Sequence, residues 1–146
     1  MPPGPPLAVI GILFAPASSM STPLEGVVVV AVEDDPDALD LLKIAMEQAG
    51  ALVVPASDAK AALETLGRVR PTVLVSDLTM PRHDGAWLVS EARRAGLLAG
   101  VPALVVTAIT MTPQQVQEAG FDAYLPKPVD PDVLCETVRV LARHAA

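Results

Sequence analysis

The chain has 146 residues, 51% of them hydrophobic and only 3% aromatic, and its formal net charge at pH 7 is −7. This length suits one domain with an aliphatic core, and the composition favours an α/β protein whose strands are covered on both faces. The acidic charge argues against direct binding of nucleic acid or of an anionic membrane. The single cysteine, Cys135, excludes a disulfide framework and favours a cytoplasmic location.

Residues 1–25 differ from the rest of the chain, because an apolar run at 7–15 stands among several prolines. The run is too short to span a bilayer as a helix, and no Lys or Arg precedes it as in a secretory signal. Three interpretations stay open: a disordered or loosely docked arm, a weak signal peptide, and an upstream start codon ahead of Met20. We assign 1–25 to an N-terminal extension and 26–146 to the folded domain, and expect no membrane span.

From residue 27 onward, β-branched runs alternate with segments of helical periodicity. Strands are predicted at 27–32, 51–56, 72–77, 102–108 and 122–128, and helical segments at 35–50, 57–69, 84–95, 112–120 and 130–145. Pro55 makes the second strand an edge strand, because proline cannot donate to a neighbouring strand. Five strand–helix units predict a doubly wound, five-stranded parallel sheet, (βα)5, with right-handed crossovers.

Each predicted helix begins at a residue suited to an N-cap. In chain order these residues are Asp35, Ser57, Asp84, Thr112 and Asp130. Three of the five are followed directly by proline, which is favoured in the first turn of a helix. Asp35 and Asp84 are therefore interpreted as caps rather than as ligands.

Polar side chains follow four of the five predicted strands. Glu33 and Asp34 follow the first strand, Asp77 ends the third, Thr107 the fourth and Lys127 the fifth. In a parallel sheet these carboxyl ends meet at one edge, where ligands bind. Neighbouring carboxylates repel one another unless a positive charge lies between them, so the sequence predicts a Mg²⁺ site there.

The chemistry that these residues offer is phosphoryl transfer. A carboxylate such as Asp77 needs no general base to act as a nucleophile. Lys127 can donate to a phosphoryl oxygen, and Thr107 can offer a hydroxyl on the other side. Charge that develops on the transferred group would then be offset by the cation and by these donors.

From about Val27 to Ala145 the chain resembles the receiver domain of two-component response regulators, the CheY-like family. The matching stretches are "VVVVAVEDDPDALDLL", "VLVSDLTMPRHDG", "ALVVTA" and "AYLPKPVD". The resemblance implies a flavodoxin-like sheet of strand order 2-1-3-4-5. It also implies that Asp77 accepts a phosphoryl group from a histidine kinase or a histidine phosphotransfer protein, and that an unidentified downstream protein reads the result.

The same resemblance assigns roles to individual positions. Glu33 and Asp34 match the acid pair that holds Mg²⁺ together with Asp77, with Mn²⁺ as an alternative ion. Thr79 matches the residue that offers a backbone carbonyl to the metal.

Further roles fall on the fourth and fifth strands. Thr107 and Tyr124 match the switch pair, Lys127 matches the phosphate-contacting lysine, and Lys127–Pro128 matches a cis peptide bond. The stretch from Thr107 to Lys127 is about two residues shorter than is usual in the family.

Two other functions compete with phosphoacceptor signalling. A degenerate receiver would keep the fold as a binding module without phosphorylation. A phosphatase of the haloacid dehalogenase type also uses a strand-end aspartate, but it needs a second aspartate where this chain has Thr79. We expect a stand-alone receiver, or the detached receiver of a hybrid kinase, that modifies itself and is not a turnover enzyme.

Overall fold

In the computed structural model, which describes residues 22–145, five parallel strands form one sheet in the order β2-β1-β3-β4-β5. This confirms the predicted α/β fold and its strand order. The strands are β1 (Val28–Val32), β2 (Leu52–Ala56), β3 (Val73–Asp77), β4 (Ala103–Thr107) and β5 (Ala123–Pro126). The helices are α2 (Pro36–Gln48), α3 (Ala59–Leu66), α4 (Gly85–Arg94), α5 (Pro113–Glu118) and α6 (Pro131–Arg143).

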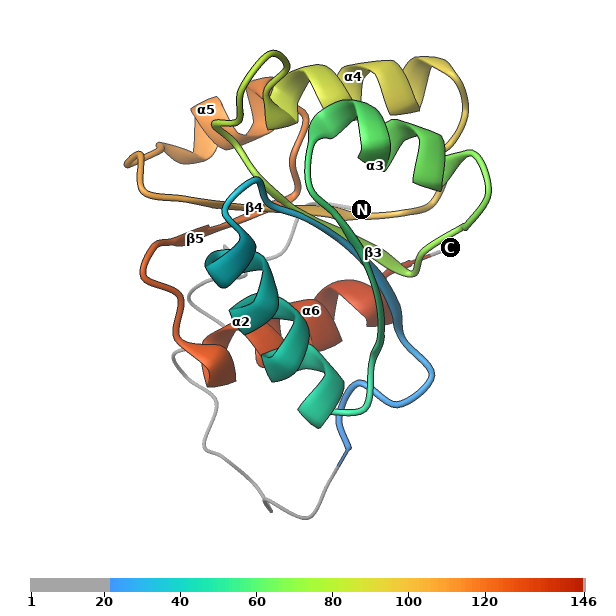
Figure 1. Cartoon of the computed structure of the whole chain (residues 1–146), viewed down its shortest axis with the longest axis vertical. Helices are drawn as coiled ribbons and strands as arrows, with labels where there is room; N and C mark the ends of the chain where they lie inside the picture. The colour runs from blue at the N-terminus through green and yellow to red at the C-terminus, as the bar shows by residue number, and fades with distance from the viewer. Residues whose placement is uncertain (1–21, 146) are drawn as a thin grey trace.

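The helices cover both faces of the sheet, as Figure 1 shows, with α2 and α6 on one side and α3, α4 and α5 on the other. Each face has its own apolar core. Val29, Val75 and Leu104 belong to the cluster beneath α2 and α6, whereas Leu74 and Val105 belong to the cluster beneath the other three helices. Alternate strand residues therefore point to opposite faces, and helices cover both faces and exclude solvent from them, as expected for a parallel sheet.

The helix starts agree with the predicted caps at four positions, and one prediction was wrong. Asp35, Asp84, Thr112 and Asp130 are N-caps whose side chains accept backbone N–H groups. The second predicted helix is capped by Asp58 rather than by Ser57, because the Asp58 carboxylate accepts the N–H of the third helical residue at 2.7 Å. Ser and Asp are both good caps, so the sequence alone did not decide between neighbours.

The last strand ends earlier than predicted. Residues 127 and 128 were included in the strand, but β5 ends at Pro126 and the Lys127–Pro128 peptide bond is cis, as expected. Proline has no N–H to donate, so the strand cannot continue pairing through this turn. The turn leaves Lys127 at the edge of the sheet, beside the ends of the other strands.

The folded unit begins before residue 26. Leu24 was assigned to the N-terminal extension, yet it is fully buried in the core beneath α2 and α6, and its N–H donates to the Ala49 carbonyl at 2.8 Å. A lone leucine between Pro23 and Glu25 has no periodicity that would have revealed this packing. Residues 1–21, the rest of the predicted extension, lie outside the described residues.

Two side chains of uncertain role have packing functions. Cys135 is half-buried on α6, its Sγ lies 3.4 Å from the Ala45 carbonyl oxygen, and burial raises the pKa of the thiol to about 11. A protonated thiol is a poor nucleophile, so Cys135 acts here as a packing residue of α6. His83 lies in the turn before α4 and is half-buried, because its ring stacks on Trp87 at 3.8 Å between centroids.

No helix among residues 22–145 has both the length and the hydropathy needed to cross a membrane.

Candidate functional site

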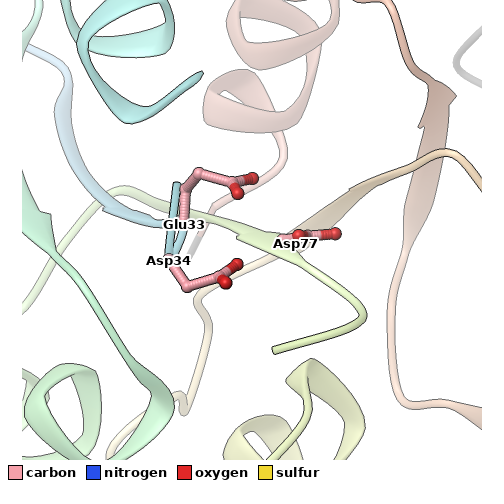
Figure 2. A group of neighbouring side chains, drawn as sticks. All are labelled: Glu33, Asp34 and Asp77. Carbon is pink, nitrogen blue, oxygen red and sulfur yellow. The ribbon is translucent and has the colours of Figure 1, made fainter. Parts of the chain in front are cut away.

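The carboxyl ends of β1 and β3 bring three carboxylates together at one edge of the sheet. Figure 2 shows Glu33 and Asp34 after β1 with their carboxylates on the side of Asp77, which ends β3. Each offers one carboxylate oxygen to a group whose members all lie within 4.8 Å of one another. Glu33 is 2% exposed and Asp77 is 7% exposed, whereas Asp34 is exposed. The cluster is therefore buried on the inside and open to solvent on one side.

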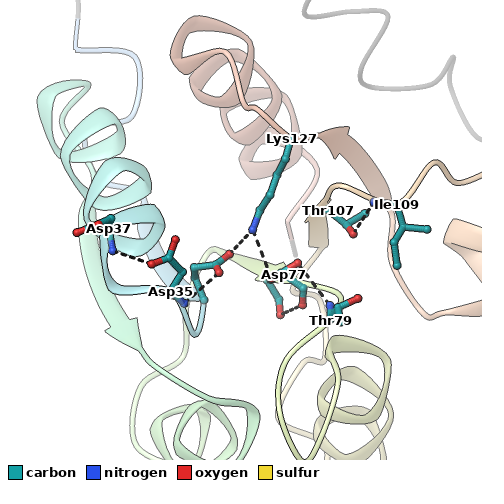
Figure 3. A network of polar contacts seen from close by, with 9 residues as sticks. Asp35, Asp37, Asp77, Thr79, Thr107, Ile109 and Lys127 are labelled. Carbon is teal, nitrogen blue, oxygen red and sulfur yellow. Dashed lines mark hydrogen bonds and ion pairs between the residues drawn. The ribbon is translucent and has the colours of Figure 1, made fainter.

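Lys127 supplies the positive charge that this cluster needs. Its ammonium group donates to Glu33 Oε2 at 2.7 Å and to Asp77 Oδ2 at 3.3 Å, and Figure 3 shows it reaching into the site from the turn after β5. An uncompensated carboxylate in such a place would cost several kcal/mol, by order of magnitude. The contact therefore links the first, third and fifth strands through one cation.

Burial dominates the ionisation of Glu33. Loss of solvent raises the pKa of its carboxyl above the usual 4.5, although the hydrogen bonds from Lys127 and from the Asp35 N–H oppose the shift. The negative charge of Asp77 adds to the increase. For Lys127, burial lowers the pKa, but the bond to Glu33 and the two carboxylate charges outweigh it and raise the pKa overall. The Glu33 carboxyl therefore gives up its proton less readily than a carboxyl in water, whereas the Lys127 ammonium holds its proton more strongly.

This shift predicts a pH dependence of folding stability in metal-free buffer. A carboxyl whose pKa is raised in the fold contributes most below its unfolded pKa, and this contribution is lost as the pH rises through the folded value. The free energy of unfolding of the wild type, minus that of Glu33→Gln, should therefore fall as the pH rises above about 4. Urea unfolding of both proteins at a series of pH values measures this difference in free energy. A difference that stays constant or grows with pH would contradict a raised pKa for Glu33.

Removing the cation should destabilise the fold more than an ordinary surface charge would. Lys127→Met leaves two buried carboxylates without their partner, and because the lysine is itself 27% exposed we expect a loss of about 2 kcal/mol. The matched control is Lys43→Met, which breaks the exposed pair with Glu47 and should cost under about 1 kcal/mol. Urea denaturation at neutral pH gives the free energy of unfolding of both variants. Equal losses of this free energy in Lys127→Met and Lys43→Met would contradict a buried role for Lys127.

The turn after β3 holds Asp77 in place. The Thr79 N–H donates to Asp77 Oδ1 at 3.4 Å, and the Gly85 N–H donates to the Leu78 carbonyl at 2.7 Å, which folds the turn back onto the strand end. Thr79 is exposed beside the cluster. Its expected role as a backbone ligand of a metal stays a prediction.

Thr107 and Tyr124 meet at a common residue of the loop that follows β4. The Ile109 N–H donates to Thr107 Oγ1 at 3.1 Å, and the Tyr124 hydroxyl donates to the Ile109 carbonyl at 3.3 Å. Thr107 is buried at the end of β4, and Tyr124 is half-buried on β5. The two residues expected to form a switch pair are thus joined through one peptide segment, although neither contacts Asp77 through a hydrogen bond given by the structure.

One residue of the site was missed in the sequence. Ser76, directly before Asp77, is fully buried, and its hydroxyl donates to the Asp77 carbonyl at 2.8 Å. The signal was present, because a hydroxyl inside the otherwise apolar run "VLVS" must find a partner once it is buried.

Fold and site together define a doubly wound α/β protein with an acidic, lysine-paired site at its strand ends. The model of the response regulator receiver domain matches residues 29–139, and the chain belongs to that family.

Known relatives agree with this assignment. The chain is 41% identical over 118 residues to an uncharacterized 14.6 kDa protein of Leptolyngbya boryana, covering 80% of this chain and 88% of that one. It is 37% identical over 118 residues to the response regulator MprA of Mycobacterium leprae, covering 80% of this chain but only 51% of MprA. Among solved structures, the chemotaxis protein CheY4 of Vibrio cholerae matches with a TM-score of 0.74 at 28% identity, covering 79% of this chain and 98% of CheY4.

The function at domain level follows from this family membership. The chain is a receiver domain of two-component signal transduction, and its role is phosphoacceptor signalling. Receiver domains work with histidine kinases or phosphotransfer proteins, which gives the class of partner.

Proposed function

We propose that Asp77 is the phosphoacceptor and that it takes its phosphoryl group from a partner's phosphohistidine with the help of Mg²⁺. The observation that carries this proposal is the convergence of Glu33, Asp34 and Asp77 within 4.8 Å, with Lys127 bonded to two of them. Two buried carboxylates that share one lysine, with a third carboxylate at a solvent-open edge, are typical of a functional site.

The residues of the cluster fit a small divalent cation. All the donors are hard carboxylate oxygens, which suit Mg²⁺ and also Mn²⁺, and the exposed Asp34 leaves one side open to water and substrate. Glu33, Asp34 and Asp77 would hold the ion, with the Thr79 carbonyl as a further ligand. When bound, the cation supplies positive charge that offsets the oxygens of the transferred phosphoryl group.

The chain's own residues perform the transfer. A carboxylate oxygen of Asp77 forms a bond to phosphorus while the P–N bond to the partner's imidazole breaks, and the imidazole nitrogen leaves with the electron pair. Lys127 is placed to donate to a phosphoryl oxygen once the carboxylates have another counterion. Because Asp77 is consumed, the protein is both catalyst and substrate, and we do not class it as a turnover enzyme.

Phosphorylation would be read at the end of β4. A new anion on Asp77 offers the Thr107 hydroxyl an acceptor, and Thr107 shares Ile109 with Tyr124. A shift of this loop would change the surface around the exposed Ile109, which a downstream protein in the cytoplasm could bind.

The test is intact-mass spectrometry of the full chain after incubation with acetyl phosphate. With Mg²⁺ we expect one phosphoryl adduct, and with a chelator none. Borohydride reduces an acyl phosphate to the corresponding alcohol, so treatment before digestion should convert Asp77 alone into homoserine.

Two outcomes would contradict the proposal. A folded protein that forms no adduct with Mg²⁺ or Mn²⁺ would favour the degenerate binding module. An adduct that maps to another carboxylate, such as the exposed Asp35, would refute the assignment of Asp77.

A further inference from the structure

We infer that Ser76 is a positioning residue for phosphoryl transfer, because its hydroxyl fixes the backbone carbonyl of Asp77. The inference rests on the proposed function of Asp77. It concerns how the nucleophile is aimed rather than which residue reacts.

The sheet supports Asp77 on one side only. On β4, Asp77 lies opposite Val106, whereas the pairing of β3 with β1 ends one residue earlier, at Ser76 opposite Val32. The peptide after Asp77 therefore leaves the sheet without a partner strand on the β1 side. At a strand end, such a peptide can rotate unless another contact holds it.

Two contacts hold this peptide. The Ser76 hydroxyl donates to the Asp77 carbonyl oxygen at 2.8 Å from a fully buried position. The same oxygen is approached by Gly85, at which a Cβ would lie only 2.4 Å away. The carbonyl is thus confined between a hydroxyl donor and the first residue of α4.

Fixing the carbonyl fixes the carboxylate. The orientation of the peptide plane sets the backbone angle ψ of Asp77, and ψ limits the χ1 rotamers that the Asp77 side chain can adopt. It also places the following turn, whose Thr79 N–H donates to Asp77 Oδ1 at 3.4 Å. A nucleophile displaced by a fraction of an ångström loses rate steeply, so a hydroxyl that never touches the substrate affects the reaction through this carbonyl.

The experiment compares rate constants of adduct formation on the full chain at saturating Mg²⁺ and acetyl phosphate. Ser76→Ala and Ser76→Cys remove or weaken the donor at similar side-chain size and should slow the rate constant about tenfold. Ser76→Thr keeps the hydroxyl and should stay within about twofold of the wild type. Circular dichroism under the assay conditions gives the folded fraction of each variant, and each observed rate constant is divided by that fraction, so that a loss of fold is not counted as slower transfer.

Thr137→Val is the matched control. Thr137 is also fully buried, and its hydroxyl donates to the Val133 carbonyl at 2.7 Å, but it lies on α6 away from the site. The Thr137→Val variant should be less stable than the wild type but should have an unchanged rate constant of adduct formation. A wild-type rate constant in either Ser76→Ala or Ser76→Cys overturns the inference, as does a Ser76→Thr variant that folds and is equally slow. Absence of any adduct on the wild type would refute the proposed function itself, and the inference with it.

Discussion

Asp77→Asn should give no phosphoryl adduct under conditions in which the wild type is fully modified. The amide oxygen is a weak nucleophile, and the substitution also removes one of the three charges that would hold the cation. We expect the rate to fall below detection, which for intact-mass spectrometry means a loss of at least about a hundredfold. Binding of Mg²⁺, followed by isothermal titration calorimetry, should weaken in the same variant.

The control is Asp84→Asn, which changes the same side-chain type seven positions further along. Asp84 is exposed, and its carboxylate caps α4 by accepting the Trp87 N–H at 2.7 Å. Asparagine is itself a good N-cap, so the fold and the adduct should both persist. Adduct formation in Asp77→Asn, or its loss in Asp84→Asn, would contradict the assignment of the nucleophile.

Gly85→Ala should damage both the fold and the site. A Cβ at this position would lie 2.4 Å from the Asp77 carbonyl oxygen and 3.2 Å from the Leu78 Cα, and both of these are backbone atoms that cannot swing aside. Either α4 or the end of β3 must move, and overpacking of this kind costs about 3 kcal/mol. The displaced atoms belong to Asp77, so even the folded fraction should be phosphorylated slowly.

Gly67→Ala provides the comparison for this substitution. Gly67 ends α3 in an ordinary right-handed conformation, with φ −72° and ψ −15°, and an added Cβ would meet its nearest atom at 3.3 Å. We expect that Gly67→Ala loses at most a little free energy of unfolding, as measured by urea denaturation, and forms the adduct at the normal rate. A Gly85→Ala protein with the stability of the wild type and the same rate of adduct formation would contradict this prediction, because the turn after β3 would then have moved to accommodate the added Cβ at little cost.

The fold was predictable because each strand and helix carried its own signal. The run at 27–32 is β-branched, the helices show apolar periodicity, and N-cap residues mark four of the five helix starts. The grouping of Glu33 with Asp77 also followed from topology, since parallel strands end at the same edge.

What the sequence did not predict depends on contacts between segments. Leu24 has no periodicity, and only the position of α2 shows that it is core. The direct bonds of Lys127 to Glu33 and Asp77 depend on how the turn after β5 lies over the sheet. Ser76 was passed over because a hydroxyl next to a carboxylate draws less attention than the carboxylate itself. In each case the partner is distant in sequence or belongs to the backbone.

The ion pair between Glu33 and Lys127 has a consequence for biosynthesis. The two residues are 94 positions apart, so the acids at the end of the first strand are made long before their counterion. During translation, Glu33 and Asp34 stay in water and the site cannot close until the fifth strand has left the ribosome and joined the sheet. A truncated chain that ends before Lys127 would therefore lack the charge balance of the acidic site, and the site can be completed only once the chain has been made through Lys127.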